Sequence, residues 1–333
     1  MSTAPQVHRP TASVVIAVVV AIVMGMLVAI QSRINGSLGA ELGDGFLAAL
    51  ISFVAGLIVL SIAMLVWRPG RVGLGRATRA VRDGSIPWWY LAGGAGGAFL
   101  VLTQTLTAAL LGIALFTVAT VSGQTISGLI IDRRGMGAMA PKPLTVFRVI
   151  GSVLALVAVV LAVSAQLRGE VPIWALLLPF LAGLAIGWQQ AVNGQVRTVA
   201  SSALTATFIN FLVGSLVLTV ATLVHSRLVG WPQSFPSELW LYLGGFIGVI
   251  FIAGAAVIVK ITGVLLLSLA TIAGQLVMSV VLDVVFPVPG HVIAATTIAG
   301  TVLTLVAVAI ASIPGRRRPV LPTPTATSGS PSD

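Results

Sequence analysis

The sequence predicts an all-α integral membrane protein whose ten transmembrane helices form two inverted five-helix repeats. The first observation is composition: 57% of the 333 residues are apolar and 8% are charged, whereas soluble domains carry about a quarter charged residues. The second is length, because ten apolar runs in the sequence reach the roughly 18 residues that cross a bilayer. The third is that polar residues recur at a fixed spacing in the two halves.

The expected spans are apolar on every face, which favours helices over the alternating strands of a membrane barrel. In order, they are 12–32, 46–67, 88–110, 112–131, 145–165, 173–195, 204–225, 239–260, 264–286 and 292–313. The chain therefore divides into a cytoplasmic N-terminal segment (1–11), a first repeat (12–165), an outer linker (166–172), a second repeat (173–313) and a disordered cytoplasmic tail (314–333). The tail is expected to be disordered because it is rich in Pro, Ser and Thr.

Lys and Arg are distributed unevenly between the two sides of such a chain. With the N-terminus inside, fifteen of the eighteen basic residues lie on the inner side, and only Arg33, Arg168 and Arg227 lie outside. This is the bias of the positive-inside rule, so both termini are expected in the cytoplasm. The net charge of +10 is thus assigned to membrane orientation, and no nucleic-acid partner is expected.

A tandem duplication connects the two halves. At an offset of 158 residues, Gln31 and Asn35 align with Gln189 and Asn193, and 13 of the 42 pairs from Gly25 to Val66 are identical. Chance would give about four or five in so apolar a composition. Further along, an offset of 151 aligns the stretch that contains Thr120, Gln124 and Asp132 with the one that contains Thr271, Gln275 and Asp283.

Each repeat has five spans, and an odd number means that the second copy crosses the membrane in the opposite sense. Inverted repeats of this kind place a substrate site near the bilayer midplane, with access that alternates as the halves rock. A duplicated structural bundle without transport is the plain alternative.

The motifs resemble a known family. "QSRINGSLG" followed by "AALISFVAG", and "VSGQTISGLIID" before the fifth span, are similar to the YdcZ-like exporter family of the drug/metabolite transporter (DMT) superfamily. The resemblance implies a ten-helix, EamA-like transporter of the bacterial inner membrane that carries small metabolites or drugs, most often outward. The small multidrug exporters of the superfamily have a glutamate in the first helix; the first span here has none, so that antiport mechanism is not implied.

The repeated amides are the first candidate site. Residues four apart share a helix face, so Gln31 with Asn35, and Gln189 with Asn193, form two polar pairs interpreted as gates or cavity walls. Amides offer donors and acceptors without charge, which suits a neutral or zwitterionic solute. The alternative is that these amides only bond helices together.

Deeper in the expected bundle, Gln124 and Gln275 are candidates for a substrate-binding cavity, with Thr120 and Thr271 one turn earlier on the same faces. Arg33 could attract an anionic solute or extend to the outer interface. Asp132 is expected to pair with its neighbours Arg133 and Arg134, and Asp44, in a short outer loop, to meet solvent. Small-residue pairs such as Gly93/Gly97 and Gly244/Gly248 are expected to be packing surfaces.

The functional expectation is a secondary transporter, most simply an exporter, of a small metabolite or drug-like solute. The alternative is a lipid flippase or a membrane enzyme acting on a lipid-linked substrate, which would need a cluster of acids, histidines or arginines. The sequence has no cysteine and contains no recognisable catalytic, metal or cofactor motif, so no enzyme activity and no cofactor are expected. The expected partners are the solute and the lipid bilayer, with a homodimer left open.

Overall fold

The computed structural model describes residues 11–136, 141, 144–164, 173–285 and 295–313, and all regular structure in these residues is helical. The first half contains α1 (Thr11–Leu42), α2 (Gly45–Val66), α3 (Arg68–Arg82), the 3₁₀ helix η1 (Trp88–Gly93), α4 (Gly94–Arg134) and α5 (Val146–Val163). The second contains α6 (Ile173–Ala200), α7 (Ala203–Val229), the 3₁₀ helix η3 (Leu239–Tyr242), α8 (Gly244–Thr262), α9 (Val264–Val285) and α10 (Ala295–Ala311). Within the described residues, six helices are long and apolar enough to cross a membrane.

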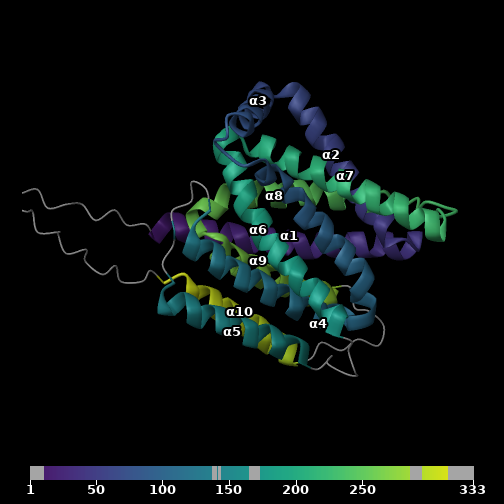
Figure 1. Cartoon of the computed structure of the whole chain (residues 1–333). Coiled ribbons are helices and arrows are strands. Elements are labelled where there is room, and N and C mark those ends of the chain that lie inside the picture. The colour runs from purple at the N-terminus through teal and green to yellow at the C-terminus, as the bar shows by residue number, and fades with distance from the viewer. Residues whose placement is uncertain (1–10, 137–140, 142–143, 165–172, 286–294, 314–333) are drawn as a thin grey trace, which may run out of the picture.

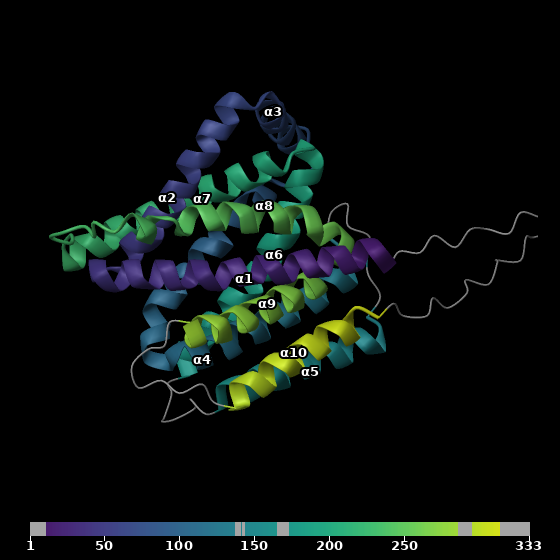
Figure 2. The ribbon, with the colours of Figure 1, turned by 180° about the vertical axis from the view of Figure 1, so that it is seen from behind.

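The helices pair across the two halves. α5 packs against α10, and α2 packs against α7, so each of these helices meets its own counterpart. α1 packs against α8 and α9, and its counterpart α6 packs against α4. Figures 1 and 2 show α5 and α10 together at one edge of the bundle, and the start of α1 and the end of α10 on the same side.

α4 occupies the place of two expected spans, 88–110 and 112–131, although it is assigned as one helix from Gly94 to Arg134. A Cβ atom placed on Gly97 would lie 3.1 Å from Oε1 of Gln189, and one placed on Gly187 would lie 2.6 Å from Cβ of Ser127. A straight helix would separate Gly97 from Ser127 by about 45 Å, yet both contact neighbouring turns of α6. The path of α4 therefore turns back between them, giving a first limb (94–103) and a second limb (119–134).

The same close contacts recur in both halves. A Cβ atom on Gly56 of α2 would lie 2.8 Å from Cδ1 of Phe211, and one on Gly214 of α7 would lie 2.7 Å from Cδ1 of Phe53. Phe53 and Phe211, which the offset of 158 aligns, have ring centroids 5.2 Å apart. Each ring thus fills the space left by the other repeat's glycine, and the sequence duplication is also a duplication of packing.

Several elements differ from the expected ones. α1 continues ten residues past the expected end at residue 32, so Gln31 and Asn35 lie inside a helix. Asp44 is 7% exposed and caps α2, accepting the N–H groups of Phe46 at 2.9 Å and Leu47 at 3.1 Å. The expectation that Asp44 meets solvent was wrong, because the unpaired N–H groups at a helix start need an acceptor.

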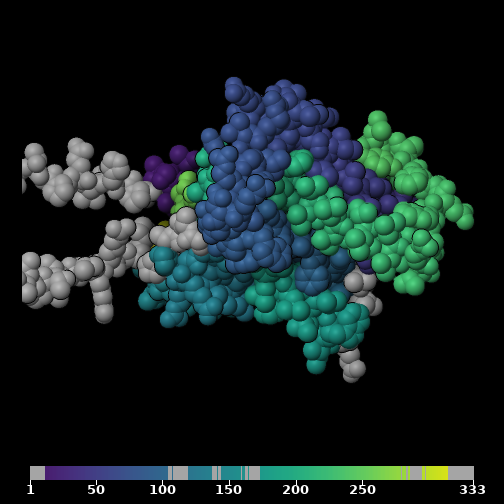
Figure 3. All heavy atoms as spheres, turned by 45° about the horizontal axis from the view of Figure 1, so that its top comes forward, coloured from purple at the N-terminus to yellow at the C-terminus, as the bar shows by residue number. Residues whose placement is uncertain are grey.

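α3 was not expected as a helix. Pro69 lies in its first turn, where the missing N–H costs nothing, and its buried residues are Gly70, Gly73, Ala77 and Ala80. It packs on α6 and α7 and is part of the blue surface at the front of Figure 3. The expected N-terminal segment (apart from Thr11), the linker 166–172 and the tail 314–333 lie outside the described residues.

Candidate functional site

The arginine count predicts that Gln31 and Asn35 lie on the outer side of the membrane and Gln189 and Asn193 on the inner side, and the two pairs are named the outer and the inner pair after that prediction. The outer pair lies on the small-residue surface of α8. A Cβ atom on Gly248 would lie 2.6 Å from Nε2 of Gln31, and Oδ1 of Asn35 lies directly against the Cα of Gly244. Ser52 of α2 borders the same place, with its Oγ 3.2 Å from a Cβ atom built on Gly244. The glycines thus provide the space that the amides fill, because any larger residue would collide with them.

The inner pair repeats this arrangement on η1 and the first limb of α4. A Cβ atom on Gly93 would lie 2.6 Å from Oδ1 of Asn193, and Gly97 faces Oε1 of Gln189. Amide oxygens against glycine Cα atoms in both halves fit the weak Cα–H···O contacts that recur between closely packed helices. The sequence predicted the pairs and the small-residue surfaces separately, and the structure shows that they contact each other.

The two copies differ in burial. In α6, Gln189, Gln190, Asn193 and Gln195 are 2%, 4%, 5% and 1% exposed. In α1, the residues at the aligned positions are half-buried or exposed, and these are Gln31, Ser32, Asn35 and Ser37. The copy of the duplicated polar surface in α6 is therefore packed more deeply than the copy in α1.

The deeper amides lie on either side of the crossing of α4 and α9. Val121 and Ile272, which the offset of 151 aligns, pack together there. Further along α4, Gly128 lies against Leu265, so this part of α4 runs antiparallel to α9. Gln124 and Gln275 follow about one turn after the crossing residues and therefore extend toward opposite ends of the bundle. Gln124 is 9% exposed and Gln275 is half-buried, which repeats the difference between the inner and outer pairs.

Thr120 and Thr271 are buried at the same crossing, at 8% and 3% exposed. Their backbone carbonyls lie against Gly183 and Gly25, the first residues of the matching sequence stretches. The Oγ1 atom of Thr271 is buried and has no hydrogen-bond partner among the described residues. The cavity candidates therefore lie at the middle of the bundle, in tightly packed surroundings.

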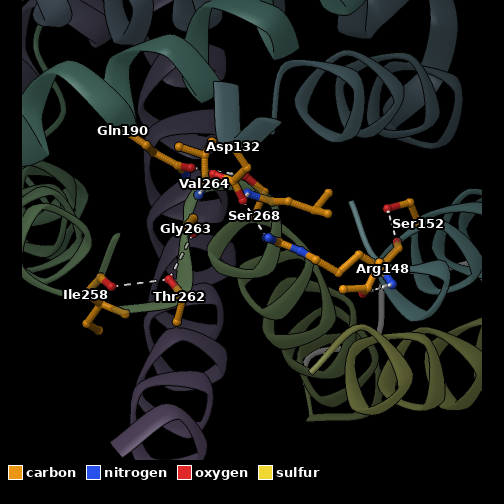
Figure 4. Close-up of polar contacts among 11 residues, drawn as sticks. Asp132, Arg148, Ser152, Gln190, Ile258, Thr262, Gly263, Val264 and Ser268 are labelled. Atoms are coloured by element: carbon orange, nitrogen blue, oxygen red, sulfur yellow. Dashed lines mark hydrogen bonds and ion pairs between the residues drawn. The ribbon is translucent and has the colours of Figure 1, made fainter. Parts of the chain in front are cut away.

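A cluster of hydrogen bonds and an ion pair surrounds Asp132, whose partners differ from those expected from the sequence (Figure 4). Asp132, at the end of α4, forms an ion pair with Arg148 of α5, and their side chains are 1% and 10% exposed. The carboxylate also accepts the N–H groups of Val264 at 2.8 Å and Leu265 at 3.3 Å. Asp132 does not form the surface pair expected with Arg133 and Arg134, which are exposed; it caps the start of α9.

Gly263 makes this cap geometrically feasible. It joins α8 to α9 with a φ of +80°, a conformation that costs glycine little. A Cβ atom there would lie 2.9 Å from Oδ1 of Asp132. A larger residue would therefore strain the turn and displace the carboxylate.

Two further buried amides were missed by the sequence, because they are not repeated. Oγ of Ser268 in α9 donates to Oε1 of Gln190 at 3.0 Å, and Nε2 of Gln195 donates to the carbonyl of Met136 at 2.7 Å. With Asp132 and Arg148, they join residues of α4, α5, α6 and α9. The repeat does not mark these two glutamines, since Ser32 and Ser37 occupy the aligned positions.

The remaining candidates are less central. Arg33 is exposed, and the side chain of Asp283 lies outside the described residues. Gly36 and Gly194, which follow the two asparagines, lie within continuous helices. Among the described residues, no group of His, Asp and Glu is placed to hold a metal ion.

An apolar helical bundle with six helices long enough to cross a membrane among the described residues defines a multi-pass helical membrane protein. The sequence profile of the family described as "Putative inner membrane exporter, YdcZ" matches residues 16–161 and 174–310. The chain belongs to this family, and the two matched stretches correspond to its two repeats.

A solved structure titled "Crystal structure of protein" aligns with a TM-score of 0.64 over 90% of this chain and 96% of its own, at 17% identity. This likeness concerns the fold. No curated protein matches the sequence.

Proposed function

We propose that the protein is a secondary transporter that exports a small metabolite or drug-like solute by alternating access between its two inverted repeats. The observation that carries the proposal is the unequal burial of aligned polar residues. Asn193 is 5% exposed, whereas its counterpart Asn35 is half-buried. Inverted repeats can exchange conformations, so a second state in which the outer copy is buried and the inner copy is open has nearly the same contacts available.

The contacts of Asp132 would stabilise the conformation in which the polar residues of α6 are buried. The ion pair of Asp132 with Arg148, together with the cap on α9, joins the first repeat to the second on the inner side. Opening that side requires these contacts to separate. The second repeat lacks the arginine of such an ion pair, because Ala299 stands where the offset of 151 would place a counterpart of Arg148. The two closed states would therefore differ in stability.

The solute would lie between the two amide pairs, near the crossing of α4 and α9. Gln124, Gln275, Thr120 and Thr271 supply uncharged donors and acceptors there. Such groups bind a neutral or zwitterionic solute without the desolvation cost of a buried ion. A membrane enzyme or flippase for a lipid-linked substrate would want a cluster of acids and histidines, and the described residues favour no such site.

The absence of cysteine permits a direct test with single substitutions at matched positions. Asn35→Cys and Asn193→Cys are compared for reaction with a membrane-impermeant thiol reagent, applied from each side of oriented vesicles. We expect Asn35→Cys to react from outside and Asn193→Cys to be protected. Adding Arg148→Gln should accelerate the inner reaction and slow the outer one, because the inner contacts are weakened.

Opposite changes at the two positions are the signature of alternating access. If Arg148→Gln changes both rates in the same direction, or changes neither, the proposed coupling between the sides is wrong. Arg134→Gln is the matched control, because it removes an exposed inner arginine from the end of α4 and should leave both rates unchanged.

A further inference from the structure

α3 carries a basic face that the proposed transport cycle does not use. Its arginines are Arg68, Arg71, Arg76, Arg79 and Arg82, with no acidic residue in the helix. All five are exposed. At 100° per residue, they fall within an arc of about 140° on the helix circumference, so the positive charge is confined to one side.

The opposite side of α3 is fixed to the bundle. Gly70, Gly73, Ala77 and Ala80 are buried, and Oγ1 of Thr205 in α7 donates to the carbonyl of Gly70 at 2.9 Å. A Cβ atom on Gly73 would lie 3.0 Å from the carbonyl oxygen of Ala200. Because the small-residue side is held against the turn between α6 and α7, the arginine side is directed away from the protein.

Two tryptophans indicate the depth of α3 in the membrane. Trp67 immediately precedes the helix and is 64% exposed, and Trp88 begins η1 and is 72% exposed. Exposed tryptophans concentrate at the level of the lipid headgroups. α3 lies between them in sequence, directly after the membrane helix α2, on the side that the arginine count assigns to the cytoplasm.

The arginine face also carries a shallow, open hollow. Its volume is about 400 Å³, and it is lined along this one helix by Arg71, Arg79, Arg82, Thr78, Leu74 and Gly75. Guanidinium groups bind phosphate oxygens through paired N–H donors, and a hydroxyl adds a further donor. Arg71 has a second task, since its Nη1 donates to the carbonyl of Met64 at 3.1 Å at the end of α2.

We propose that α3 is a docking surface for anionic phospholipids of the inner leaflet, with a headgroup phosphodiester in this hollow. The second repeat offers no equivalent, because residues 230–238 between α7 and η3 contain no basic residue. The surface is therefore one-sided. A lipid bound there would contact a helix of the first repeat that rests on a turn of the second.

The test measures lipid binding to the full-length protein in detergent, independently of transport. Dioctanoyl phosphatidylglycerol should raise the thermal unfolding temperature in a saturable manner, because a ligand of the native state stabilises it. Dioctanoyl phosphatidylcholine should not. Arg79→Gln/Arg82→Gln should weaken phosphatidylglycerol binding roughly 30-fold, from the usual contribution of each basic residue near an anionic surface. Arg71 is left unchanged because it caps α2.

Two control variants test whether binding depends on the charge of these residues and on their position. Arg79→Lys/Arg82→Lys keeps the charge and should retain most of the binding, and Arg133→Gln/Arg134→Gln removes two exposed inner charges elsewhere and should bind as the wild type does. The proposal is overturned if the glutamine variant at 79 and 82 binds phosphatidylglycerol normally, or if the control pair loses as much. Equal stabilisation by phosphatidylcholine would also overturn it, and equal stabilisation by glycerol phosphate would indicate a site for soluble anions instead.

Discussion

Asp132 and Arg148 form a buried ion pair whose carboxylate also caps the first N–H groups of α9. One acidic side chain thereby joins α4, α5 and α9. A buried charge of this kind is tolerated only while its partners are in place, because the cost of removing it from water is offset by them alone.

Removing Arg148 should therefore destabilise the protein strongly. We expect Arg148→Met to lower the free energy of unfolding by about 3–5 kcal/mol, since it leaves the carboxylate buried and unpaired. Asp132→Asn should cost less, because its amide oxygen can still accept from Val264. The double variant Asp132→Asn/Arg148→Met should recover part of the free energy of unfolding that Arg148→Met loses. Thermal or denaturant unfolding in detergent provides the measurement, with the exposed Arg133→Met as control; a loss no larger than in that control would contradict the assignment.

Gly244→Ala should destabilise the contact between α1 and α8, because the added methyl group collides with Oδ1 of Asn35. Overpacking of this kind costs about 1–3 kcal/mol. Adding Asn35→Ala should restore part of the stability by removing the obstructing amide.

Gly75→Ala on α3 is the matched control, since nothing lies within 4 Å of its built Cβ atom. That change should be neutral or slightly stabilising, because alanine favours a helix over glycine by up to about 1 kcal/mol. If Gly244→Ala behaves as Gly75→Ala does, the close approach of α1 and α8 is wrong.

Gln124→Ala and Gln275→Ala should each reduce export while leaving membrane insertion intact. Comparing the metabolites released by a deletion strain and its parent would first identify the solute, and each variant is then tested for restoring its export. Removing one hydrogen-bonding partner of a bound polar solute costs about 1–3 kcal/mol, or roughly a fivefold to 150-fold loss in affinity. Unchanged export in both variants would remove these residues from the binding site.

Cysteine accessibility should also establish the topology. Glu41→Cys should react with an impermeant reagent from outside and Arg76→Cys from inside, because both side chains are exposed and the arginine count places them on opposite sides. Reaction from the reverse sides would refute the orientation, and with it the inner position of Asp132 and Arg148.

The duplication visible in the sequence predicted much of the packing. Phe53 and Phe211, or Asn35 and Asn193, were matched by their offset of 158, and in the structure they make equivalent contacts. The repeat thus identified residues with the same role. It could not say what Asn35 touches, because its partner Gly244 lies on a helix more than 200 residues later.

The residues that were missed share one property: nothing in the repeat marks them. Arg148 has no counterpart in the second half, and Gln190 and Gln195 align with serines. The basic face of α3 was visible as a count of inner arginines, but its confinement to one side of a helix was not. Glycine at three positions of that segment gives little helix propensity, so packing on α6 and α7 stabilises α3.

The sequence by itself determined that this is a duplicated helical membrane protein and which of its residues are equivalent. Composition shows whether a chain folds in water or in a lipid bilayer, and the equivalent positions of a duplication can be matched without knowledge of the fold. Only the tertiary structure decided that Asp132 binds Arg148 rather than its neighbours Arg133 and Arg134, and that the polar residues of α6 are buried while their counterparts in α1 are less so. These outcomes depend on which helices meet. Two repeats of related sequence can pack in different ways, and the contacts between helices far apart in the chain decide which copy is buried.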